Sequence, residues 1–161
     1  MTATPAMSGG RPALALNLEL SHGRPGASAR VELHDRPATD AGGMEFTIRR
    51  AHVSLHGCVD GVATTRIARL LDDLNSRGAA EVILDCADLS HIDFREVPDL
   101  VAAADRFEAH GGLVAFQGLS RYLVDLFRLA GCASHLRDWP SNAVLLAAGA
   151  PVPEPGRERA S

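Results

Sequence analysis

The stretch from Glu81 to Gln117 constrains the fold most, because it carries the whole pattern of a βαβ unit. Two short apolar runs, at 82–84 and 113–116, have the length and composition of buried strands, although periodicity alone would also fit a buried helix. Apolar residues recur between them at helical spacing, and these are Val97, Leu100, Val101, Ala104 and Phe107. We therefore expect two parallel strands joined by a helix through a right-handed crossover.

Strand patterns precede this unit. Apolar residues alternate with polar ones over 14–20 and again at 31–33, which predicts an extra N-terminal hairpin. Alternation returns at 46–48 and at 53–55. A second hairpin is therefore predicted there, with its turn at residues 50–51, although these are not strong turn residues.

Helical patterns account for most of the remaining chain. An apolar stripe over 63–74 ends before Gly78, and Ser120 is a suitable N-cap for a helix over 123–130. A short terminal helix is expected at 143–148. The order predicts an α/β fold, with a small mixed, mainly parallel sheet and helices packed on it.

The predicted organisation has three parts. Residues 1–43 form an N-terminal extension, partly disordered and containing the extra hairpin, and its segment 36–43 is interpreted as a linker. Residues 44–148 form the main domain, and residues 149–161 form a flexible tail.

Composition excludes several classes of protein. The net charge of −4 argues against a broad basic face for nucleic acid. Three widely spaced cysteines argue against a disulfide framework and favour a reducing compartment. The sequence has no apolar run long enough to insert into a membrane and no pattern of a secretory signal. We therefore expect a cytoplasmic protein.

The ordered pieces of the main domain resemble a STAS domain. The pieces that carry the resemblance are Leu55-His56-Gly57, Leu84-Asp85, Leu89 to Asp93, Gly111-Gly112, Gly118 to Ser120, and Leu129 to Gly131. No single piece is specific, and the ordered set over about residues 44–148 makes the resemblance. It implies the fold of bacterial anti-sigma factor antagonists, which also occurs in stressosome proteins and at the ends of sulfate transporters.

The turn before the crossover helix departs from the family pattern. In phosphorylatable STAS proteins it reads Asp-Ser-Ser/Thr-Gly before an apolar residue, and a partner kinase phosphorylates the first serine. Asp93 and Val97 fit this pattern, but Phe94, Arg95 and Glu96 stand at the three intervening positions. The family serine position is thus Phe94, and the resemblance implies a partner-binding loop that phosphorylation does not switch. Ser90 is a weak substitute candidate.

The predicted partner-binding residues all lie in this loop, and they are Ser90, His91, Asp93, Phe94, Arg95, Glu96 and Val97. Asp93 is expected to cap the following helix. Phe94 either packs into the core or anchors an interface, and the sequence leaves both readings open. Arg95 and Glu96 are interpreted as solvated charges of the first helical turn.

No catalytic residue, metal site or cofactor is predicted. Ser90, His91 and Asp93 include the residue types of a hydrolytic triad, but triads are usually assembled from separate segments. Cys58 and Cys86 are interpreted as buried residues at strand ends, because their spacing fits no zinc pattern.

The main prediction is a non-enzymatic binding module that resembles an anti-sigma factor antagonist. Its partner would be an anti-sigma factor, a related kinase or another STAS protein. A second hypothesis is a scaffold subunit of a stressosome-like or transporter-associated complex, in which the N-terminal hairpin supports a homo-oligomer. A third is a small α/β enzyme that uses His91 or a cysteine at the head of the crossover.

Overall fold

The computed structural model describes residues 12–23 and 25–132. In chain order the elements are β1 (Leu14–Ser21), β2 (Ala27–Thr39), β3 (Glu45–Val59), α1 (Gly61–Ser76), β4 (Ala79–Ile92), the 3₁₀ turn η2 (Phe94–Glu96), α2 (Val97–Ala109), β5 (Leu113–Gln117) and α3 (Arg121–Leu129). The helix expected at 143–148 lies outside the described residues, and so does Trp139, which we expect from the sequence to be a packing residue.

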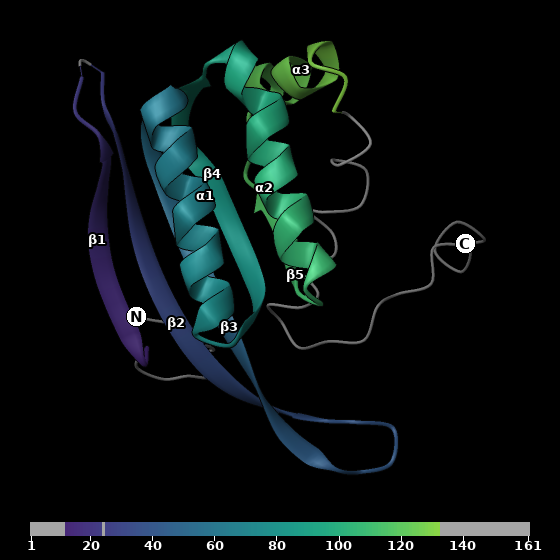
Figure 1. Ribbon diagram of the computed structural model, residues 1–161. Helices are drawn as coiled ribbons and strands as arrows, with labels where there is room; N and C mark the ends of the chain where they lie inside the picture. The colour runs from purple at the N-terminus through teal and green to yellow at the C-terminus, as the bar shows by residue number, and fades with distance from the viewer. Residues whose placement is uncertain (1–11, 24, 133–161) are drawn as a thin grey trace, which may run out of the picture.

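The strands form one five-stranded sheet in the order β1-β2-β3-β4-β5 (Figure 1). β1, β2 and β3 pair antiparallel, whereas β3, β4 and β5 pair parallel. The predicted mixed α/β fold is confirmed, and so is the parallel pairing of the two strands that flank α2. The predicted N-terminal hairpin is also confirmed, because β1 pairs with β2 from Leu14 opposite Leu33 to Ser21 opposite Ala27.

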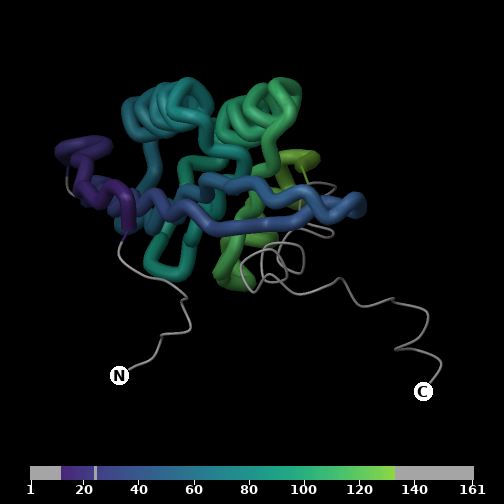
Figure 2. Tube along the Cα trace, turned by 90° about the horizontal axis from the view of Figure 1, so that it is seen from below, coloured from purple at the N-terminus to yellow at the C-terminus, as the bar shows by residue number. Residues whose placement is uncertain are grey.

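Helices α1 and α2 lie side by side on one face of this sheet, as Figures 1 and 2 show. The core lies between that face and the helices, and side chains such as Val53, Ile67 and Leu100 are fully buried there. α3 lies at the end of the sheet where α2 begins (Figure 1). The rings of Phe116 and Phe127, 5.4 Å apart in an edge-to-face arrangement, pack α3 against β5.

The predicted second hairpin is wrong, because residues 46–48 and 53–55 belong to the single strand β3. β3 pairs with β2 without interruption from Glu45 opposite Thr39 to Gly57 opposite Ala27. The apolar positions change parity because Ala51, Val53 and Leu55 face the helices, whereas Phe46 and Ile48 point to the other face of the sheet. The apolar residues therefore move from one face of the sheet to the other within a single strand, and this gives the same sequence pattern as two strands separated by a turn.

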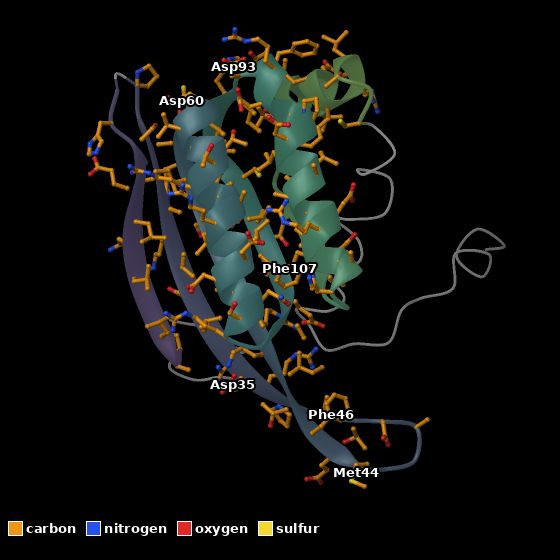
Figure 3. The ribbon with its side chains drawn as sticks, viewed as in Figure 1. Asp35, Met44, Phe46, Asp60, Asp93 and Phe107 are labelled. Atoms are coloured by element: carbon orange, nitrogen blue, oxygen red, sulfur yellow. The ribbon has the colours of Figure 1, made fainter. Side chains whose placement is uncertain are left out.

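The predicted linker at 36–43 is also wrong for its first half, residues 36–39. β2 continues to Thr39, and the chain turns only at residues 40–44. Pro37 is accommodated because among the described residues β3 is the only neighbour of this part of β2, and a proline is tolerated on an edge strand. β2 and β3 thus extend as a two-stranded ribbon beyond the rest of the sheet (Figures 1 and 3), and we call residues 36–48 the β2–β3 arm.

Candidate partner-binding surface

The predicted Ser90–Val97 loop consists of the last three residues of β4, Asp93, the 3₁₀ turn η2 and the first residue of α2. We keep the name loop for this segment, which lies at the end of the sheet where the parallel strands β3 and β4 finish. The backbone N–H of Asp93 donates to the carbonyl of Val59 at 2.8 Å, so the loop begins against the end of β3. α1 starts next to it, and Figure 3 shows Asp93 and Asp60 at the same end of the molecule. Asp60 caps α1 by accepting a hydrogen bond from the N–H of Ala63 at 2.9 Å.

Asp93 caps the 3₁₀ turn rather than the helix proper. Its carboxylate accepts hydrogen bonds from the backbone N–H of Arg95 at 3.0 Å and from the Arg95 guanidinium, with Nη2 to Oδ2 at 3.0 Å. The guanidinium hydrogen bond, followed by the backbone one, lowers the pKa of Asp93 below its ordinary value. The expected capping role is therefore found one turn earlier than predicted, and the carboxylate is held in its charged form.

Phe94 points into solvent, with 45% of its surface exposed. This resolves the choice that the sequence left open between a core position and an exposed one. Val97, three residues later, is fully buried and anchors the loop in the core. The loop therefore exposes the side chain of Phe94 while Val97 fixes the loop to the core.

Glu96 lies against the first residue of α1. A Cβ atom added at Gly61 would be 3.3 Å from its carboxylate oxygen Oε2. A carboxylate in this position is favourable because the N-terminus of a helix carries partial positive charge. Glu96 thus links the loop to α1 and is half-buried, in contrast to the solvated charge predicted for it. Arg95 is exposed, as predicted.

His91 contacts Tyr122, a residue that the sequence did not indicate. The phenolic oxygen of Tyr122 is 2.6 Å from Nδ1 of His91, and the two rings stack with centroids 5.7 Å apart. Tyr122 comes from α3, so the contact ties that helix to the loop. The only signal in the sequence was an aromatic residue just after the cap Ser120, on a helix whose other aromatic, Phe127, is buried.

The apolar side chains exposed at this end are Val62 (54%), Phe94 (45%) and Tyr122 (48%). Val62 is the second residue of α1 and is adjacent in the chain to Gly61, which lies against Glu96. We define the loop surface as the Ser90–Val97 loop together with Val62 and Tyr122. It combines exposed apolar groups with the charges of Asp93 and Arg95.

Ser90, His91 and Asp93 do not converge on one point. The hydroxyl of Ser90 donates to the carbonyl of Gly57 at 3.1 Å and lies 3.3 Å from the sulfur of Cys58. His91 contacts Tyr122, and Asp93 contacts Arg95. Each of the three therefore has a different partner.

The cysteines differ in their burial. Cys86 is buried as expected, and desolvation raises its pKa to about 12, so its thiol stays protonated at neutral pH. Burial also raises the pKa of Cys132. Cys58 is only half-buried, which corrects the prediction of a buried residue. Residues 12–23 and 25–132 contain no group of three or more potential metal ligands, and no described helix is long and apolar enough to span a membrane.

No protein-family model matches the sequence, and no curated protein matches it either. Solved structures do resemble the fold. The anti-sigma factor antagonist SpoIIAA in its unphosphorylated form aligns with a TM-score of 0.51 and 18% identity, over 62% of this chain and 89% of SpoIIAA. The murine anion transporter Slc26a9 in its inward-facing state aligns with a TM-score of 0.50 and 15% identity, over 62% of this chain and 18% of the transporter. The predicted resemblance is thus confirmed at the level of the fold: this chain has a STAS-like, SpoIIAA-like fold.

Proposed function

We propose that this chain is a non-enzymatic protein-binding module that acts as an anti-sigma factor antagonist and docks through the loop surface. Its partner is an anti-sigma factor or a related kinase, in the cytoplasm of a bacterium, where its three free cysteines stay reduced. Phosphorylation of the loop does not switch this binding. The partner is held constitutively or is regulated elsewhere.

The exposed side chain of Phe94 carries this proposal. It occupies the position at which the resemblance places a phosphorylatable serine, and 45% of it is exposed on a loop anchored by the buried Val97. An exposed aromatic side chain on a well-anchored segment is typical of interface hot spots. The nearby Val62 and Tyr122 enlarge the apolar area that a partner could cover.

Two observations support the absence of a switch and of catalysis. The hydroxyl of Ser90 already donates to the carbonyl of Gly57, so a phosphate there would require this contact to break. Ser90, His91 and Asp93 each contact a different residue, and a nucleophile needs its base within hydrogen-bonding reach.

The first test is phosphorylation of the purified chain by an anti-sigma factor kinase of the source organism, with ATP labelled at its γ-phosphate. A phosphorylatable antagonist from the same organism serves as the positive control for the kinase. We expect no label in residues 90–97, as measured by mass spectrometry of the peptides. Stoichiometric label in that segment would show that the loop is switched after all.

The second test measures binding of the same purified anti-sigma factors to the variants Phe94→Ala and Phe46→Ala. The two phenylalanines are a matched pair, because each is 45% exposed and Figure 3 shows Phe46 at the opposite end of the molecule from Asp93, the neighbour of Phe94. We expect Phe94→Ala to weaken binding about tenfold or more, since truncating a hot-spot aromatic typically costs more than about 1.4 kcal/mol. Phe46→Ala should leave the affinity per chain within about twofold, because Phe46 lies outside the loop surface. Equal losses would remove the loop surface from the interface, and no binding by the unaltered chain would remove this partner class.

A further inference from the structure

The β2–β3 arm is a second exposed feature, far from the loop surface. β1 ends its pairing at Leu33, and β4 begins opposite Arg49. In residues 36–48, β2 and β3 therefore pair only with each other among the described residues. The arm exposes Met44 (68%) and Phe46 (45%), and Figure 3 shows both at the tip that extends from the body. An isolated two-stranded ribbon is only marginally stable in water. A partner that covered these two side chains would therefore stabilise the arm.

The turn at the tip is held firmly. The carboxylate of Asp40 accepts hydrogen bonds from the N–H groups of Gly42 and Met44, both at 2.9 Å. The N–H of Asp40 donates to the carbonyl of Met44 at 3.0 Å, and Gly43 adopts a positive φ of 87°. The arm thus offers a preformed strand edge, and little conformational entropy is lost when another strand adds to it.

The two edges of the arm differ. Met44 directs its carbonyl toward β2, and because the peptide groups of an antiparallel strand alternate, those of Glu45 and Thr47 point to the outer edge of β3. The outer edge of β2 contains Pro37, which has no N–H and discourages strand addition. The free edge of β3 is therefore the one that can accept another strand.

We propose that two copies of this chain associate through their arms, with the β3 edges pairing antiparallel about a two-fold axis at Phe46. In this register Phe46 lies opposite Phe46 of the second copy, and Met44 lies opposite Ile48. Glu45 lies opposite Thr47 and exchanges backbone hydrogen bonds with it. All the apolar side chains of the pairing lie on one face, and facing aromatic and aliphatic side chains stabilise such pairs.

A second copy fits this edge because the segment is complementary to itself. No charged residue lies directly opposite a residue of the same charge. The turn of the second copy, which carries Asp40 and the small Gly42 and Gly43, comes beside the start of β4. That corner has room for the turn, because Gly78 has no side chain and a Cβ atom added there would meet nothing within 4 Å. The two-fold symmetry of the dimer places such a turn beside such a corner twice.

The free edge of β1 offers a second copy less exposed apolar surface than the arm does. The apolar residues Leu14, Leu16 and Leu18 already pack against the core beneath α1. The opposite side of β1 carries Ala15, Asn17 and Glu19, which offer little apolar surface. Pairing at the arm, by contrast, covers the most exposed large apolar side chains of β2 and β3 and of the turn between them.

The first experiment measures the molar mass of the full-length chain by light scattering over a range of concentrations. We expect twice the monomer mass of 17.0 kDa for the unaltered protein. Phe46→Lys places two like charges on the axis and should give a monomer, whereas Ala15→Lys, on the β1 edge, should remain a dimer. Circular dichroism checks that both variants fold. A monomeric unaltered chain, or a dimer lost in Ala15→Lys and kept in Phe46→Lys, would overturn the proposal.

The second experiment tests the register by cysteine crosslinking in a Cys58→Ser background, with the buried Cys86 and Cys132 retained. Residues on the axis form a non-hydrogen-bonded pair about 4.5 Å apart at Cα, within the range of a disulfide. Phe46→Cys should therefore form a disulfide-linked dimer on mild oxidation. Thr47→Cys is the matched control, one residue away and on the opposite face, and should crosslink at least tenfold more slowly. Equal crosslinking, or faster crosslinking of Thr47→Cys, would exclude this register.

This surface is independent of the loop surface, so either can fail without the other.

Discussion

Phe94 and Phe46 are equally exposed, but the structures beneath them differ. Phe94 lies on a short turn between the buried residues Ile92 and Val97, and its neighbours contact α1 and α3. Phe46 lies on the β2–β3 arm, whose two strands pair only with each other among the described residues, although Arg36 forms an ion pair with Glu81 of β4 at 3.8 Å. The loop surface is thus rigid because the core positions it, whereas the arm owes its order to its own turn and cross-strand pairs. We therefore expect the loop surface and the arm to tolerate substitutions differently, although Phe94 and Phe46 are equally exposed.

Truncation of an apolar side chain should separate the two ends most strongly. Leu100 is fully buried in α2 beneath the loop, whereas Met44 is 68% exposed at the tip of the arm. We expect Leu100→Ala to lower the free energy of unfolding by about 3 kcal/mol, through lost burial and an incompletely filled cavity. Met44→Ala should change it by no more than about 0.5 kcal/mol. Both truncations are made in the Phe46→Lys background, which should keep the chain monomeric, and urea unfolding followed by circular dichroism measures them. Similar losses would mean that the arm is packed against the body of its own chain.

A pair of glycines with similar backbone angles gives a sharper comparison. Gly57 (φ 92°) and Gly43 (φ 87°) both adopt the left-handed region, so alanine at either position costs about 1 kcal/mol of strain. At Gly57 an added Cβ would also collide with the carbonyl oxygen of Gly26, whereas at Gly43 it would meet nothing within 4 Å. We therefore expect Gly57→Ala to cost at least about 2 kcal/mol, since overpacking adds about 1–3 kcal/mol to the strain.

The same urea titration tests this pair. If Gly43→Ala proved as costly as Gly57→Ala, steric contact would not distinguish the two sites. Strain alone would then account for both losses, and the end of the sheet near the loop would be no more tightly packed than the turn of the arm.

The sequence predicted the parts of the fold that depend on local periodicity. The βαβ unit, α1 and the Ser120 cap of α3 follow from spacing and capping chemistry, and each is found. The arm was missed because the apolar positions of β3 change face after Ile48, a feature that depends on which neighbours a strand has rather than on the strand itself. The change of parity between Ile48 and Ala51 was a visible signal, but it also fits two separate strands.

In the candidate site, too, the local features could be predicted from the sequence and the long-range contacts could not. The loop could be located from the sequence because its residues are contiguous, and the cap formed by Asp93 is a local interaction. The contact between His91 and Tyr122 joins residues 31 positions apart, and that between Gly61 and Glu96 joins two helix starts. Such contacts depend on how α1 and α3 pack on the sheet, which periodicity does not encode.

The smallest expected effects concern two exposed ion pairs, one at each end. Arg95 lowers the pKa of Asp93 in the loop, and Arg49 lowers that of Asp35 where the arm leaves the body, in each case chiefly by a side-chain hydrogen bond. Because the folded pKa lies below the unfolded value of about 3.9, each carboxylate contributes stability that is fully present above that pH. The contribution is lost as the pH falls through the folded pKa.

Carbon-13 NMR of the side-chain carboxyl groups follows both titrations in one sample. We expect Arg95→Ala to raise the pKa of Asp93 toward its ordinary value and to leave that of Asp35 unchanged, since salt screens charges at this separation. Arg49→Ala should do the reverse. Each variant should also lose less stability than the unaltered chain on acidification below about pH 4, because the folded and unfolded pKa values then converge. If Arg95→Ala moved both titrations, the two ends would be coupled through the fold, and the independence assumed for the loop surface and the arm would be wrong.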